Sequence, residues 1–224
     1  AGDERSADLL SALVSNARAL HVQDFTLRYV DELGALSGRD SWDAAVDATW
    51  RFAGFDRKPA PTEVLVRFVA EDGGVALESI GGGDRRSPVW LSGPVQVRRT
   101  PTTLVLVAGP PAEADGLARR AQRAVPVVRR VLPGWRPHLV VEVPRSAAAL
   151  DQALDATPGE YANIAAVTTT VDGSVTPDSP VHVFVNPDVF SHLLPQGAQV
   201  VISYEATHVA TLAATSTMPL WLLE

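Results

Sequence analysis

The sequence predicts an α+β fold in two parts, and three observations lead to that prediction. Between residues 5 and 55, apolar residues recur with the helical period of about 3.6. Between residues 63 and 108 they alternate with polar residues, which is typical of half-buried strands. From residue 111 onward, strand-like and helix-like segments follow one another. We therefore expect N-terminal helices with an antiparallel sheet at 1–110, and an α/β unit at 111–224.

The first part begins with expected helices. The segment SADLLSALVSNARALHVQDF places apolar residues on one helical face, at positions 9, 10, 13, 14, 17 and 20. The segment SWDAAVDATWRFAGF repeats this spacing, and Ser41 is suited to cap its N-terminus. The proline-rich FDRKPAPTE then interrupts the pattern. We expect two or three helices ahead of the sheet.

Three or four short strands are expected next, in EVLVRFVAED, GVALESIGGGD, VWLSGPVQVRR and TLVLVAG. The segment GGGDRR at 81–86 lacks the G-K-[ST] of a phosphate-binding P-loop, so we interpret it as a hairpin loop. Helices followed by an antiparallel meander resemble, in element order alone, the cone-shaped fold of nuclear transport factors and SnoaL-type cyclases.

The second part begins with GPPAEADG, a linker or helix lead-in. A helix is expected in ADGLARRAQRAVPVVRRVLPGW, in which Pro126 is a candidate kink. Strands are expected in HLVVEVP, NIAAVTTTVDG and PVHVFVNP. Further helices are expected in SAAALDQALD, in DVFSHLL and at 199–215.

The composition excludes several classes of protein. The chain of 224 residues has a net charge of −7, which argues against nucleic-acid binding because phosphate contacts need a basic surface. The absence of cysteine excludes disulfides, thiolate nucleophiles and cysteine metal sites. No apolar run is long enough for a transmembrane helix. The charged start AGDERSADLL indicates a trimmed N-terminus and not a signal peptide.

The expected helix at 199–215 carries the candidate site. Tyr204 and His208 are four residues apart, so both side chains project from one helical face, with Glu205 beside them. This is the geometry of H-E-x-x-H, in which two imidazoles hold zinc and the glutamate deprotonates the metal-bound water. Here Tyr204 occupies the position of the first histidine.

Fifteen residues separate His208 from Glu224. Pro219 suits the first turn of a second helix, which would turn Glu224 back toward the first. With this spacing, the segment 199–224 resembles the active-site helix pair of the gluzincin zinc peptidases, in particular the actinobacterial peptidase MA-like type. The residues that match the family pattern are Glu205, Thr207, His208, Val209, Pro219, Trp221, Leu222 and Glu224.

The resemblance implies a zincin-like α/β unit that ends in the active-site helix. It implies Glu205 as the general base and His208 and Glu224 as zinc ligands, with Tyr204 in the remaining ligand position. A phenol, with a pKa of about 10, binds zinc only after losing its proton, whereas an imidazole offers a lone pair at neutral pH. The chain also stops where the family continues with G-x-A, which indicates a shortened chain. Both departures predict an impaired zinc site.

Two functions from different classes are therefore open. The first is a zinc-dependent metallopeptidase, in which Glu205 passes a proton from water to the leaving amine of a peptide or protein substrate. The second is a non-catalytic module of peptidase descent that binds a peptide or protein. The resemblance also implies a location outside the cytoplasmic membrane, through an N-terminal anchor.

The remaining histidines and most arginines are interpreted as structural. His182 alternates with apolar residues in VHVFVNP and is expected to face solvent, and that strand is the candidate edge strand for aligning substrate. His192 is expected on a helix surface, while His21 and His138 have no partner motif. The arginines expected on solvated faces are Arg98, Arg99, Arg119, Arg120, Arg123, Arg129 and Arg130.

Overall fold

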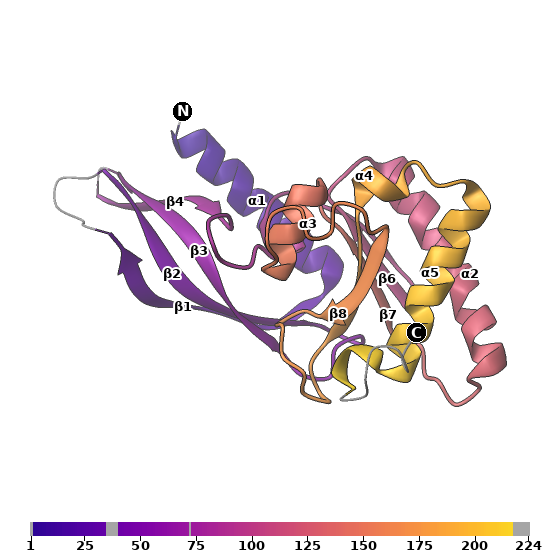
Figure 1. Ribbon diagram of the computed structural model, residues 1–224. Coiled ribbons are helices and arrows are strands. Elements are labelled where there is room, and N and C mark those ends of the chain that lie inside the picture. The colour runs from indigo at the N-terminus through magenta and orange to yellow at the C-terminus, as the bar shows by residue number, and fades with distance from the viewer. Residues whose placement is uncertain (1, 35–39, 72, 217–224) are drawn as a thin grey trace.

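The computed structural model describes residues 2–34, 40–71 and 73–216, and these form two β-sheets and five α-helices (Figure 1). One sheet is antiparallel and the other is mixed. The α+β prediction is therefore confirmed at this level. None of the described helices is both long enough and apolar enough to cross a membrane.

The first sheet is antiparallel throughout, with its four strands in chain order. Its strands are β1 (Val22–Leu33), β2 (Ser41–Phe52), β3 (Ala60–Glu71) and β4 (Gly74–Ile80). The prediction of a helix from Ser41 is therefore wrong. Side chains at every second position from Ala44 to Phe52 are buried, and the polar ones between them face outward. Burial of this alternating face against the core outweighs the helical spacing.

One helix, α1 (Gly2–Leu20), precedes the first sheet and lies beside β4 and the short helix η1 (Val89–Leu91). The helix expected over the first segment ends at Leu20, and the chain continues as β1. The buried Asn16 amide donates to the carbonyl oxygens of Trp90 and Gly93, each at 2.8 Å. These hydrogen bonds fasten α1 to the η1 segment.

The second sheet is mixed and has the strand order β5-β6-β7-β9-β8. Its strands are β5 (Gln96–Arg99), β6 (Thr103–Val107), β7 (Leu139–Val143), β8 (Ala166–Thr170) and β9 (Val181–Val185). The three central strands are parallel, and β5 and β8 pair antiparallel at the two edges. Because β5 and β6 precede residue 110, the change from one sheet to the other comes earlier in the chain than the predicted division.

Two long helices, α2 (Pro111–Val131) and α5 (Pro195–Thr211), pack against each other on the second sheet (Figure 1). The expected helices at both places are confirmed, and α2 continues through Pro126. The shorter helices are α3 (Ala147–Leu154), α4 (Pro187–Phe190) and η2 (Ala213–Thr215).

Strand β6 separates two apolar cores. Leu104 and Leu106 face a core shared with the first sheet, η1 and α3. Val105 and Val107 face a core shared with α2 and α5. The three central strands β6, β7 and β9 are thus buried on both faces, which explains why they are mostly apolar in the sequence, whereas the edge strands β5 and β8 are more polar.

Candidate functional site

Helix α5 presents Tyr204 and His208 on one face, as their spacing predicts. The two rings meet edge to face, with 4.5 Å between their centroids and 83° between their planes. Tyr204 is 47% exposed and His208 is half-buried. The opposite face of α5 is anchored in the core by Ala198, Ile202, Ala206 and Val209.

Glu205 points toward β8 and not into solvent. Its side chain is buried, and its Oε2 accepts a hydrogen bond from the Thr168 hydroxyl at 2.6 Å. Burial raises the pKa of the Glu205 carboxyl above its usual range, and the hydrogen bond from Thr168 offsets part of that rise. The expected general base is therefore held by a neighbouring strand.

The expected third ligand, Glu224, lies outside the described residues, as do Pro219, Trp221 and Leu222. The structure therefore brings Tyr204 and His208 together and directs Glu205 to β8, and it does not test the approach of Glu224 to that group.

Zinc would need at least three suitable protein ligands at this place. Within residues 2–34, 40–71 and 73–216, no group of three histidine or acidic side chains is arranged to hold a metal ion. At α5 the described side chains supply one imidazole, one phenol packed against it, and a carboxylate bound to Thr168. These residues do not fit a zinc centre.

The edge strand beside α5 is β8. The sequence had suggested β9 for that position, and this is wrong, because β9 lies between β7 and β8. Strand β8 pairs with β9 on one side, and α5 and η2 lie against it. No described strand pairs with its other side.

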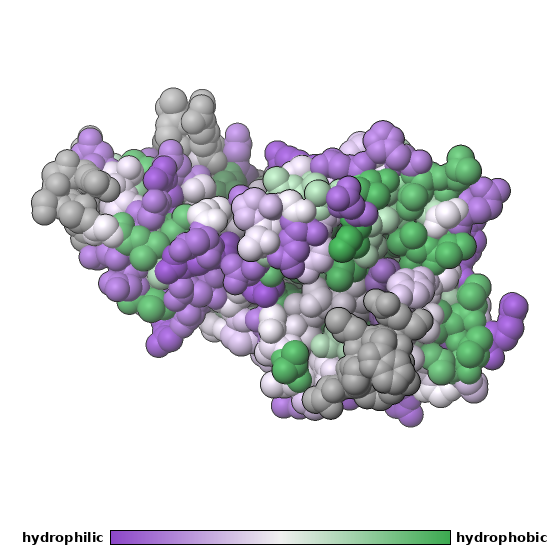
Figure 2. All heavy atoms as spheres, in the orientation of Figure 1, coloured by the Kyte–Doolittle hydropathy of each residue, from purple (hydrophilic) through white to green (hydrophobic). Residues whose placement is uncertain are grey.

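Exposed apolar side chains extend over α5 and the loop before it. Leu194 is 76% exposed and Val200 is 66% exposed, and Val200 lies one turn before Tyr204. In Figure 2, green atoms gather over this side of the molecule. The helix that carries the candidate site therefore has an apolar outer surface next to the strand edge.

His182 is buried, contrary to the expectation that it faces solvent. Its Nε2 lies 3.0 Å from Asp56 Oδ1 and its Nδ1 lies 2.6 Å from Glu142 Oε1. The imidazole is 1% exposed and stacks on Phe52 at 5.5 Å between ring centroids. A glutamate inside the apolar strand LVVEV was the available sequence signal for this cluster, because an isolated buried carboxylate is costly.

The turn at 53–56 after β2 is held by side chains on or next to strands of the second sheet, Arg99 on β5 and His138 just before β7. Arg99 donates to the carbonyl oxygens of Ala53 and Leu20, and its guanidinium lies 4.8 Å from the Phe55 ring centroid. His138 Nδ1 lies 2.9 Å from the Gly54 carbonyl oxygen. Arg99 is thus not on a solvated face; Arg98 and Arg120 are also half-buried.

A cavity of about 600 Å³ adjoins this turn. Phe55 and Asp56 line it on one side, and the ends of α2 and α5 line it on another, at Val131 and Leu212. The cavity therefore lies one turn beyond His208 along α5, at the start of β9.

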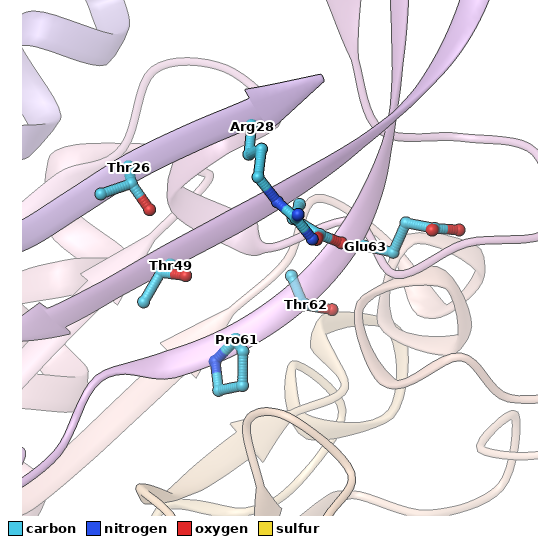
Figure 3. A pocket seen from close by; sticks show the side chains of 7 residues that line it. Thr26, Arg28, Thr49, Pro61, Thr62 and Glu63 are labelled. Atoms are coloured by element: carbon cyan, nitrogen blue, oxygen red, sulfur yellow. The ribbon is translucent and has the colours of Figure 1, made fainter. Parts of the chain in front are cut away.

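A second hollow, a groove of about 460 Å³, lies on the outer face of the first sheet (Figure 3). Its lining residues are Thr26, Arg28, Asp47, Thr49, Pro61, Thr62 and Glu63. Arg28 pairs with Asp47, and Glu63 pairs with Arg85, each at 2.5 Å. Because these charges neutralise one another, the groove has no concentrated charge. Arg85 belongs to the GGGDRR segment, a loop that connects β4 to η1 and not two strands of a hairpin.

Comparison of the chain with protein-family models, with curated proteins and with solved structures gives no match in any of the three.

Proposed function

We propose that this chain is a non-hydrolytic module of gluzincin descent that binds an extended peptide or protein segment along β8, beside α5. The observation that carries the proposal is the hydrogen bond from Thr168 to Glu205. It engages the carboxylate that a hydrolase would need for activating water. Tyr204 supports the same conclusion, because a phenol stands where the family has its first imidazole.

Strand β8 has the properties needed for strand addition. It is an antiparallel edge strand, and no described strand pairs with its outer side. A segment added there would form main-chain hydrogen bonds, while its alternate side chains would contact the neighbouring surface. Val200 and Tyr204 supply exposed apolar and aromatic area for those side chains.

The direct test is a titration of ¹⁵N-labelled protein with an extended peptide of alternating apolar and polar residues. We expect amide shifts at 166–170 and 200–208. The matched control is the same peptide with N-methylated backbone amides, which lacks main-chain donors and should bind at least about tenfold more weakly. Shifts confined to other surfaces, or equal binding of both peptides, would contradict the proposal.

A pair of variants tests the part played by α5. Val200→Glu places a charge on the proposed binding surface and should weaken peptide binding. Val127→Glu makes the same change on α2, where the parent side chain is 48% exposed, and should leave binding unchanged. If the two substitutions changed peptide binding equally, α5 would not be part of the binding surface.

Zinc-dependent peptide hydrolysis is the second candidate. The observation that favours it is the position of α5 beside an antiparallel edge strand, with Glu205 and His208 at family spacing. Incubation of a peptide mixture with the protein and equimolar zinc, followed by mass spectrometry, separates the two functions. Cleavage that disappears in Glu205→Gln would establish the hydrolase and overturn the non-hydrolytic proposal.

A further inference from the structure

Three buried ionisable side chains meet between the two sheets. His182 is on β9, Glu142 is on β7, and Asp56 is in the turn after β2. The imidazole is 1% exposed and each carboxylate side chain is 4% exposed. The cluster therefore joins a turn of the first sheet to two central strands of the second.

The two ring-nitrogen contacts of His182 have the geometry that an imidazolium makes with two carboxylates. Each ring nitrogen faces a carboxylate oxygen, at 3.0 Å to Asp56 and 2.6 Å to Glu142. A carboxylate only accepts hydrogen bonds, and a neutral imidazole has one N–H, whereas an imidazolium donates from both nitrogens. The other oxygen of Asp56 accepts from the Phe52 backbone N–H at 2.7 Å, and this second bond holds the Asp56 side chain in place.

The surroundings of the ring contain no further charge among the described residues. Strand β2 contributes Phe52, which stacks on the imidazole, and β9 itself contributes Phe184. Strand β8 places Thr169 opposite His182. Burial alone would lower the pKa of His182, but the two carboxylates outweigh burial and raise it to about 9.

The turn at 53–56 docks on the second sheet through this cluster, through Arg99 and through His138. We propose that His182 is a proton-dependent tie, in which an imidazolium bound to Asp56 and Glu142 holds this turn against the second sheet. Loss of the ring proton removes one of the two hydrogen bonds and leaves a buried nitrogen lone pair facing a carboxylate oxygen. Because Phe55 and Asp56 line the cavity of about 600 Å³, the tie also fixes one wall of that cavity.

The test is NMR of the ¹⁵N-labelled imidazole rings between pH 6 and pH 10. At pH 7.5 we expect both nitrogens of His182 to carry exchange-protected protons and to resonate as an imidazolium, with a midpoint of about 9. His192 lies on the exposed surface, and its ring resonances serve as the internal reference for a solvent-exposed imidazole. A neutral His182 ring at pH 7.5 would overturn the proposal.

Single substitutions of the carboxylates provide an independent test. Asp56→Asn and Glu142→Gln should each lower the His182 midpoint by about one pH unit or more, because each removes an opposing charge. The matched control Asp178→Asn removes a surface partner of Lys58 and should leave the midpoint unchanged. If Asp56→Asn and Asp178→Asn give the same midpoint, the tie does not exist.

The pH dependence of protein stability tests whether protonation of His182 stabilises the docked turn. The His182 pKa is raised on folding, so its stabilising contribution is complete below about pH 6.5 and is lost as the pH rises toward about 9. The urea midpoint should fall over this window in the parent protein, and the fall should be smaller in His182→Gln. An equal slope in both proteins would count against the tie, and if His182→Gln does not fold, the Asp56→Asn titration decides the question.

Discussion

The Thr168 hydroxyl on β8 donates to the Glu205 carboxylate on α5 across 2.6 Å, and this hydrogen bond joins the edge strand of the second sheet to the helix that covers it. The same hydroxyl lies 3.2 Å from the Glu205 carbonyl oxygen. In a hydrolase of the H-E-x-x-H type, this carboxylate would need access to water at the metal. In this protein the Glu205 carboxylate is instead hydrogen-bonded to the neighbouring strand β8.

Removing the Thr168 hydroxyl should destabilise the protein. Thr168→Val keeps the shape of the side chain but leaves the buried Glu205 carboxyl without its donor, at a cost of about 1–3 kcal/mol. Urea unfolding at pH 7 measures the change. Thr169→Val is the control, because the neighbouring hydroxyl makes no side-chain hydrogen bond within the described residues and its removal should cost much less.

Glu205→Gln should stabilise the protein at neutral pH. The folded-state pKa of Glu205 is raised by burial, so the parent protein loses stability as the pH rises from about 4.5 through that value. Glutamine has no such charge, and its carbonyl oxygen still accepts from Thr168. Melting temperatures of the two proteins should converge near pH 4 and separate as the pH rises to 7. A variant that melts lower than the parent at pH 7 would show that the ionised carboxylate contributes more than its burial costs.

Tyr204→His should increase zinc affinity, because it replaces a phenol by an imidazole one turn from His208. The parent protein should hold little zinc after dialysis against a slight excess of the metal, and the variant should hold substantially more. Atomic absorption on the purified proteins measures the content. Tyr204→Phe controls for loss of the phenol alone, and equal zinc in the histidine and phenylalanine variants would argue against gluzincin descent.

Replacing the two neighbouring arginines of β5 by lysine should lower the stability of the protein by different amounts. Arg99 combines two carbonyl acceptors with the face of Phe55, a combination that an ammonium group cannot reproduce, so Arg99→Lys should cost about 1–3 kcal/mol. Arg98 pairs with the partly exposed Asp115, so Arg98→Lys should cost less than about 1 kcal/mol. Chemical unfolding measures the loss of unfolding free energy in each variant. Equal losses in Arg99→Lys and Arg98→Lys would contradict this prediction.

The second half of the chain was more predictable than the first. The strands around Val141 and Val183 are short apolar runs bounded by turn residues, and the helix beginning at Pro111 has a clear polar face. The segment from Ser41 to Phe52 is ambiguous in sequence, because Ala44 and Ala48 fit both a helical and an alternating pattern. Pairing with β1 and β3 makes this segment a strand, and the spacing of residues within the segment holds no information about those partners.

The candidate site was predictable only in part. The four-residue spacing placed Tyr204 and His208 on one face, because that relationship is local to the helix. The partner of Glu205 is 37 residues away, and the carboxylates around His182 are 40 and 126 residues away. Such contacts depend on strand order, and strand order in the second sheet differs from chain order.

The position of β5 and β6 in the second sheet has a consequence for biosynthesis. The antiparallel hairpins of the first sheet connect neighbours in the chain, so they can form as soon as they leave the ribosome. Strand β6 is apolar on both faces, and it acquires its parallel neighbour β7 only after all of α2 has been synthesised. Until then β6 can pair with β5 only, and its open edge on the β7 side is a site for aggregation. A gene fragment that stops at residue 110 would keep that hazard permanently, whereas one that extends through residue 143 supplies the missing neighbour.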